Sequence, residues 1–201
     1  MHLARMLALL MSGEAEVWGL LALMLFHQSR YAAREDAQGR LVDLEHQDRD
    51  LWRSDLIVTA DRILSSVLIK GQAGPYQLQA AISAVHAHSA SFEQTDWKQI
   101  VLLYRLLRRQ QSNPVIELNL AVALSYAESP SIGLSYLEQI PQLTSMQGYH
   151  SLHAARADMQ RRDGQAQAAI ESYTTAIACC GNQVERNYLQ SRIETIKASM
   201  T

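Results

Sequence analysis

Residues 149–180, YHSLHAARADMQRRDGQAQAAIESYTTAIACC, carry the clearest structural pattern in this chain. Asp163-Gly164 has the chemistry of a turn, between a helix that begins near Tyr149 and a second, returning helix. In the returning helix, small or apolar residues recur at helical spacing: Ala166, Ala169, Ile170, Tyr173, Ala176, Ile177 and Cys180. The stretch therefore predicts two antiparallel helices packed against each other.

The same pattern occurs 36 residues earlier, close to the period of roughly 34 residues in tetratricopeptide helix pairs. At this offset Ala121, Gly133 and Leu137 align with Ala157, Ala169 and Tyr173. The match is incomplete, because Gln160 and Gly181 stand where that repeat usually has an aromatic residue and a proline. We expect an all-α chain of stacked antiparallel helix pairs, a tetratricopeptide-like superhelix, over residues 71–201. A last amphipathic helix, with Leu189, Ile193 and Ile196, closes the array.

Residues 1–70 form a second predicted domain, an N-terminal helical subdomain with a charged loop. Its first helix, residues 1–11, places Leu3, Met6, Leu7 and Leu10 on one face. It starts without a capping residue, which suggests a chain cut from something longer. Residues 14–28 predict a helix that is apolar nearly all round. We expect a small β-hairpin or an irregular loop over residues 30–45. Asp36–Gly39 contains the residue types that favour a turn, and the sequence of Leu41–Leu44 indicates a short strand.

Composition excludes several classes of protein. Of the 201 residues, 48% are apolar and 19% are charged, which is typical of a soluble globular chain. The net charge of −2 provides no basic field for nucleic acid, so direct contact with nucleic acid is not expected. The apolar run Val17–Phe26 is too short to cross a bilayer. The adjacent Cys179 and Cys180 indicate a reducing, cytoplasmic setting.

Asp43–Arg53 (DLEHQDRDLWR) combines dense charge with a tryptophan, just before a long apolar helix. One interpretation makes Glu45, Asp48, Arg49 and Trp52 a recognition surface or a latch between the two halves of the chain. The other is structural: the carboxylates cap a helix start and Trp52 packs in the core. The residues alone support both interpretations equally.

A further set of polar residues lies on the otherwise apolar inner helices. Under the repeat alignment, Glu117 and His153 occupy the same position of successive units, with Gln77 as a third member. Such side chains would line the groove of a superhelix and contact a partner, or they would satisfy one another between helices. The complete set comprises Gln77, Gln79, Glu117, Asn119, His153, Arg156 and Asp158.

The sequence contains few residue patterns that are typical of catalytic or metal-binding sites. His150 and His153 stand three apart on a helix and could hold a metal with Asp158, but no second ligand pair supports them. There is no glycine-rich phosphate loop, no Gly-x-Ser-x-Gly elbow and no Cys-x-x-Cys. We therefore expect no enzyme activity, no cofactor and no bound metal.

Six ordered motifs resemble the C-terminal extension of one class of extracytoplasmic-function (ECF) RNA polymerase sigma factors. They are Leu20–Leu25 (LLALML), Glu45–Trp52 (EHQDRDLW), Gly74–Ile82 (GPYQLQAAI), Thr95–Trp97 (TDW), Asn113–Asn119 (NPVIELN) and Tyr149–Asp158 (YHSLHAARAD). The extension includes tetratricopeptide-like helices and follows the two sigma domains that contact core polymerase and promoter. No stretch of this chain resembles those sigma domains.

The resemblance implies a regulatory domain in transcription initiation, which controls or docks the sigma domains through protein contacts. Its partners would be the sigma domains of the parent protein, core RNA polymerase, or a further regulatory protein. The alternative is a stand-alone helical-repeat adaptor that binds a peptide or protein. Sigma-like domains encoded in frame upstream of Met1 would distinguish the two.

Overall fold

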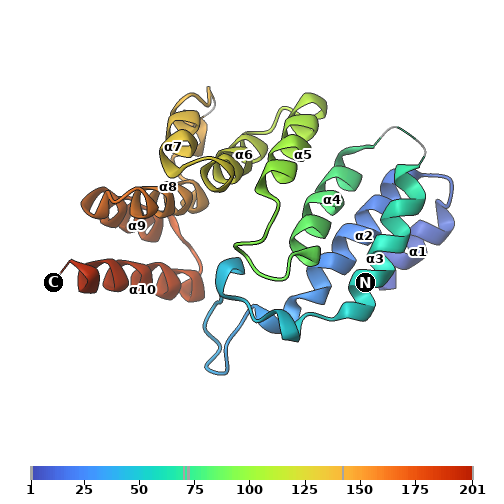
Figure 1. The fold of residues 1–201 in the computed structure, drawn as a ribbon, viewed down its shortest axis with the longest axis horizontal. Coiled ribbons are helices and arrows are strands. Elements are labelled where there is room, and N and C mark those ends of the chain that lie inside the picture. The colour runs from blue at the N-terminus through green and yellow to red at the C-terminus, as the bar shows by residue number, and fades with distance from the viewer. Residues whose placement is uncertain (1, 70, 72, 142, 201) are drawn as a thin grey trace. The chain divides into compact units, whose positions relative to one another are not determined.

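The computed structural model describes residues 2–69, 71, 73–141 and 143–200, and it is all-α (Figure 1). No strand occurs among these residues, and none of their helices combines the length and apolar character that a bilayer-spanning segment requires. The described α-helices are α1 (His2–Leu10), α2 (Ala15–Ser29), α3 (Ser54–Leu68), α4 (Pro75–His88), α5 (Trp97–Gln110), α6 (Pro114–Ala127), α7 (Pro130–Glu138), α8 (His150–Arg162), α9 (Ala166–Cys179) and α10 (Gln183–Ser199).

Two compact units make up the chain. Unit 1 comprises Met1–Asp36 and Val42–Ser112, and unit 2 comprises Ala37–Leu41 and Asn113–Thr201. The sequence placed the division at residues 70 and 71 instead. Helix α4 packs against α2 and α3, and α5 packs against α4, so α5 joins unit 1 through α4.

Unit 1 is organised around α2, as its all-round apolar character predicts. Leu25 and Phe26 are almost fully buried there, and Leu64 of α3 and Ala84 of α4 join the same core. Gly19 permits the close approach of α4, since a Cβ at this position would lie 2.7 Å from Gln77 Cγ and 2.9 Å from its backbone nitrogen. The core of unit 1 therefore depends on one glycine in the middle of α2.

Glu16 of α2 caps α4 from outside that helix. The helix begins after Gly74, which has no side chain to accept a hydrogen bond. The Glu16 carboxylate instead accepts from the backbone N–H of Tyr76 (2.9 Å) and of Gln77 (3.2 Å). A carboxylate suits the positive end of the helix dipole, so this contact fixes where α4 starts against α2.

The connection from α2 to α3 is an irregular loop rather than a hairpin of strands. It contains the 3-10 turns η1 (Tyr31–Ala33), η2 (Leu44–His46) and η3 (Arg49–Leu51). The strand expected at Leu41–Leu44 is reduced to an isolated β-bridge at Leu41, because the Asp43 carboxylate accepts from the backbone N–H of His46 and starts η2 at Leu44. Backbone contacts still hold the loop: Val42 donates to Arg34 O (2.8 Å) and Arg53 donates to Ser29 O (2.9 Å).

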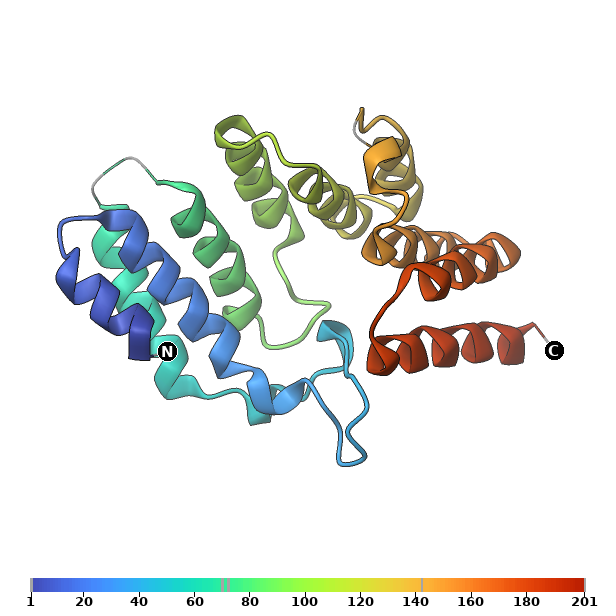
Figure 2. The same cartoon turned by 180° about the vertical axis from the view of Figure 1, so that it is seen from behind.

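Unit 2 contains the predicted helix pairs. Helix α6 packs against α7, α8 against α9, and α10 against α9 (Figure 2). The aligned repeat positions are all buried, which confirms the helical-repeat prediction: Ala121, Gly133 and Leu137 in the first pair and Ala157, Ala169 and Tyr173 in the second. Glycine at position 133 allows α7 to pack closely against α6. A Cβ atom at this position would lie 2.8 Å from Ala121 O and 2.5 Å from Ser125 Cβ.

Candidate functional site

The charged stretch before α3 packs into unit 1. Trp52 is 9% exposed, and the Arg49 guanidinium carbon lies 4.1 Å from the centre of its ring. Arg49 Nη1 donates a 2.6 Å hydrogen bond to the backbone oxygen of His86, near the end of α4. Asp48 caps η3 by accepting from the backbone N–H of Asp50 (2.9 Å). These contacts are those of the structural interpretation, with Glu45 half-buried and Asp48 exposed.

Positive charges gather around His86. Burial, with the charges of Arg30 and Arg49, lowers the pKa of His86 to about 4. Burial also lowers the pKa of Arg30 to about 10, and the charges of Arg34 and Arg49 add to that shift. His86 is therefore neutral in the folded protein near neutral pH, and its ring packs edge-on against Trp97 with centroids 5.2 Å apart.

Asp158 is the centre of a network that joins three helices of unit 2. It accepts from Arg161 (2.8 Å) and Arg162 (2.9 Å) of its own helix and from the Tyr126 hydroxyl of α6 (3.2 Å), and Arg192 of α10 lies 3.7 Å away. Burial would raise its pKa, but the hydrogen bonds and charges of Arg161 and Arg162 outweigh burial, so the pKa is lowered. Asp158 of α8 therefore links α8 to α6 and α10.

The other inner-helix residues do not form one polar row. Gln77 is buried and donates to Glu16 (3.1 Å), and Gln79 donates to Pro75 O (3.3 Å). Glu117 accepts from the Tyr136 hydroxyl, and buried His153 contacts Gln147 O through Nε2 (2.8 Å). Asn119 is exposed. Gln77 and Glu117 therefore make contacts between helices, as Asp158 does. Gln79 bonds within its own helix, and His153 bonds to the segment that precedes α8.

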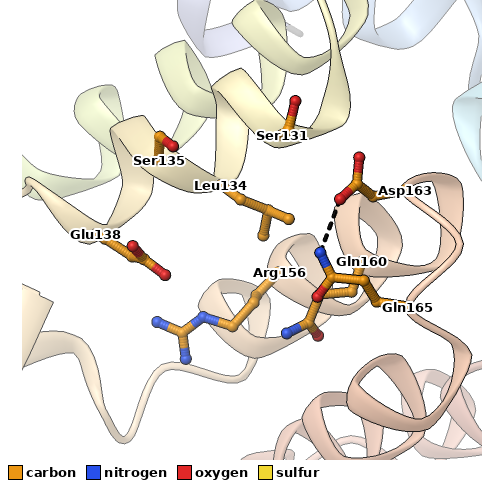
Figure 3. A pocket seen from close by; sticks show the side chains of 8 residues that line it. All are labelled: Ser131, Leu134, Ser135, Glu138, Arg156, Gln160, Asp163 and Gln165. Atoms are coloured by element: carbon orange, nitrogen blue, oxygen red, sulfur yellow. Dashed lines mark hydrogen bonds between the residues drawn. The ribbon is translucent and has the colours of Figure 1, made fainter.

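Arg156 lines a polar pocket of about 230 Å³ between α7 and α8 (Figure 3). Ser131, Leu134, Ser135 and Glu138 of α7 stand on one side of it, and Arg156 and Gln160 of α8 on the other. Asp163 and Gln165, hydrogen-bonded to each other (2.7 Å), close one end. Half-buried Arg156 lines this pocket and has no hydrogen bond or ion pair with another described residue, so its donors are available to a ligand.

Helix α1 leaves its apolar face uncovered. Leu3 and Leu10 are 80% and 81% exposed, and Met6 and Leu7 beside them are also exposed. The side of α1 that packs against unit 1 carries Ala8, which is fully buried, and Ala4. The sequence placed the four large residues on one face, and the structure shows that this face does not join the core.

The three residues considered as metal ligands, His150, His153 and Asp158, do not form one group. His153 contacts a backbone oxygen and Asp158 is engaged by arginines, as described above. The neighbours of His150 are instead Glu185 and Cys180, and ligand atoms of these three residues lie within 4.8 Å of one another. Spacing along one helix could not predict this group, because its members come from α8, the end of α9 and α10.

Comparison with known proteins yields two matches. Residues 1–68, which end with α3, match the model of a family described as a "Family of unknown function (DUF6596)". The chain is 40% identical over 197 residues to "Uncharacterized protein R00370" of Rhizobium meliloti (strain 1021), which is 98% of this chain and 46% of that protein. No solved structure matches. The chain thus spans about half the length of this curated relative.

Proposed function

We propose that this chain is the regulatory, protein-binding part of a bacterial ECF-type RNA polymerase sigma factor. In this role it contacts the sigma domains of its parent protein or core polymerase, and it neither catalyses a reaction nor contacts nucleic acid directly. The six ordered motifs that resemble the extension of such sigma factors motivate the proposal. The structural observation that carries it is the exposed leucine face of α1: Leu3, Met6, Leu7 and Leu10.

This face reverses the usual arrangement of a surface helix. An amphipathic helix normally turns its large apolar residues to the core and its small or polar residues to water. In helix α1, Ala8 is buried and Ala4 is half-buried, whereas Leu3 and Leu10 are exposed at the two ends of the apolar face. Contiguous exposed apolar patches are typical of interaction surfaces, which supports a docking role for this face. The helix is therefore suited to pack against a partner protein.

The longer relative supports a partner on the same polypeptide. More than half of the Rhizobium meliloti protein lies outside the segment that matches this chain. A domain joined to its partner by a linker meets it at high effective concentration, so a modest interface of a few leucines is sufficient. Regulation then requires only that a signal changes the balance between the docked and released states.

The test is a binding measurement with purified sigma domains of the parent protein, with core polymerase as a second partner. Leu3→Glu and Leu10→Glu place a charge in the α1 face, and each should weaken binding by at least about tenfold, since burial of one leucine contributes roughly 1.5–3 kcal/mol. Leu102→Glu, at a leucine of α5 that is 58% exposed, is the matched control and should bind as wild type. Equal binding by all three variants, or no binding by the wild type, overturns the proposal.

A second candidate function is the stand-alone adaptor, and the Arg156 pocket favours it. An arginine guanidinium can donate two parallel hydrogen bonds to one carboxylate, and the neighbouring Ser131, Ser135 and Gln160 add hydrogen-bonding groups. The pocket is small enough to suit one acidic side chain of a peptide. Peptides with Asp or Glu should then bind the wild type and lose affinity for Arg156→Gln, while Arg105→Gln on exposed α5 surface has no effect. Peptide binding without any binding to sigma domains would favour the adaptor over the sigma-factor proposal.

A further inference from the structure

A group of three potential metal ligands lies in unit 2, outside the surfaces described so far. His150 Nε2 is 2.9 Å from Glu185 Oε2, and Cys180 Sγ is 3.5 Å from the same oxygen. All three ligand atoms lie within 4.8 Å of one another. The residues come from the first turn of α8, the residue after α9 and the first turn of α10, so three separate segments converge on one point.

We propose that His150, Cys180 and Glu185 bind a zinc ion, with water at the fourth position. Zinc takes thiolate, imidazole and carboxylate ligands at about 2.0–2.3 Å, so a tetrahedral site separates its ligand atoms by roughly 3.3–3.7 Å. The 3.5 Å between Cys180 Sγ and Glu185 Oε2 already fits this range, and the 2.9 Å between His150 Nε2 and the same oxygen must lengthen by about half an ångström. The third pair, His150 Nε2 and Cys180 Sγ, lies within 4.8 Å and must close by up to about 1 Å. Soft sulfur combined with nitrogen favours zinc over magnesium or calcium, which prefer oxygen ligands.

Local structure holds the three ligands in place. Asn182 caps α10 by accepting from the backbone N–H of Val184 (2.9 Å) and of Glu185 (3.4 Å), which fixes the backbone of Glu185. Arg186 Nε donates to the backbone oxygen of Cys180 (2.5 Å), which anchors the cysteine. Such supporting contacts orient ligands before the metal arrives.

Access and chemistry also suit a metal. Cys180 is 1% exposed as a residue, whereas the side chains of His150 and Glu185 are 31% and 36% exposed, so an ion can enter from the solvent side. Zinc replaces the thiol proton of Cys180, which passes to buffer, and a Zn–S bond forms without any redox change. The bound ion would join α8, α9 and α10, and this brace does not depend on the sigma-factor proposal.

Metal binding is tested on the full chain, stripped with a chelator and titrated with Zn²⁺ against a chromophoric competitor. We expect one equivalent of zinc and a higher melting temperature. With Co²⁺ in place of zinc, a thiolate-to-cobalt charge-transfer band reports directly on sulfur ligation. His150→Gln and Glu185→Gln should each weaken zinc binding by at least about tenfold, because even supporting residues contribute that much.

The adjacent cysteines supply a matched pair of variants. Cys180→Ser should lose the charge-transfer band and the rise in melting temperature, whereas Cys179→Ser should keep both, because Cys179 Sγ lies against Gln147 O (3.6 Å) and is not one of the three ligands. Circular dichroism establishes that each variant is folded, and His150→Gln provides a second test if Cys180→Ser is not. The proposal is overturned if the wild type binds no stoichiometric zinc, if the cobalt form lacks the sulfur band, or if the band survives Cys180→Ser.

Discussion

The guanidinium of Arg49 stacks over the ring of Trp52, with 4.1 Å between its central carbon and the ring centroid. The same arginine donates to the backbone oxygen of His86 and so ties the loop before α3 to the last turn of α4. A cation over an aromatic face is worth about 0.5–2 kcal/mol, depending on how far it is desolvated. The densest charge in this sequence thus stabilises unit 1.

Substitution of this pair should lower stability. Trp52→Ala removes a buried indole and should reduce the free energy of unfolding by roughly 3–5 kcal/mol. Arg49→Ala should reduce it by about 1–3 kcal/mol, because it removes the stack and the hydrogen bond to His86. Arg53→Ala, which breaks an exposed pair with Asp55, should have no measurable effect in denaturant unfolding. Unchanged stability of Trp52→Ala would mean that Trp52 is not packed as described.

Gly133 and Gly148 offer a matched test of the close contact between α6 and α7. Gly133→Ala would place its Cβ 2.8 Å from Ala121 O, so the helices must move apart, at a cost of about 1–3 kcal/mol. Gly148→Ala meets nothing within 4 Å and should be neutral or slightly stabilising. Thermal unfolding of the two variants measures the difference. Equal melting temperatures would contradict the close packing at Gly133.

Stability should fall as the pH drops below neutrality because of His86. Its pKa in the folded chain is about 4, below the ordinary value of 6.5. Between these values the unfolded chain binds a proton that the folded chain does not, so the free energy of unfolding decreases from pH 6.5 toward pH 4, by on the order of 2–3 kcal/mol. The lowered pKa of His27 acts in the same direction.

His86→Gln should flatten this pH dependence, measured by urea unfolding at several pH values. Val101→Ala, a buried apolar change in α5, should lower stability at every pH and keep the slope of the wild type. If His86→Gln retains the full slope, His86 is not the group that titrates.

Asp158 should contribute to the stability of unit 2. Asp158→Ala removes the acceptor of Arg161, one of the acceptors of Arg162 and the bond from Tyr126, so it should cost about 1–3 kcal/mol. Because the Asp158 pKa is lowered, its contribution is present above the unfolded value near 3.8 and is lost as the pH falls through the folded value. The exposed Asp55→Asn is the control and should be silent in the same unfolding experiment. A silent Asp158→Ala would mean that the network does not hold α6, α8 and α10.

Periodicity predicted the helical fold well, since burial of one helix face is a local property. The constant offset that aligned Ala121 with Ala157 identified positions that are buried in both helix pairs. The strand expected at Leu41–Leu44 is reduced to an isolated β-bridge at Leu41, because the Asp43 cap starts a 3-10 turn at Leu44. The cap formed by Asp43 therefore favours the irregular loop over the β-hairpin, the two alternatives expected for residues 30–45.

Sites were less predictable than helices, because they depend on contacts between distant segments. Glu117 and His153 occupy equivalent repeat positions, yet one accepts from Tyr136 and the other contacts Gln147 O, so equivalence in sequence did not produce a shared row. The exposed face of α1 could not be predicted either, since a leucine row indicates burial without saying what covers it. The proximity of Cys180 to His150 has no signature in sequence spacing.

Hydrogen–deuterium exchange of this chain, alone and mixed with the sigma domains that the proposed function assigns to its parent protein, tests the central claim most directly. If α1 docks on those domains, the amides of His2–Leu10 should exchange more slowly in the mixture, and Leu10→Glu should abolish that protection while Leu102→Glu preserves it. Unchanged exchange in α1, whether a complex forms through another surface or no complex forms, would contradict the account.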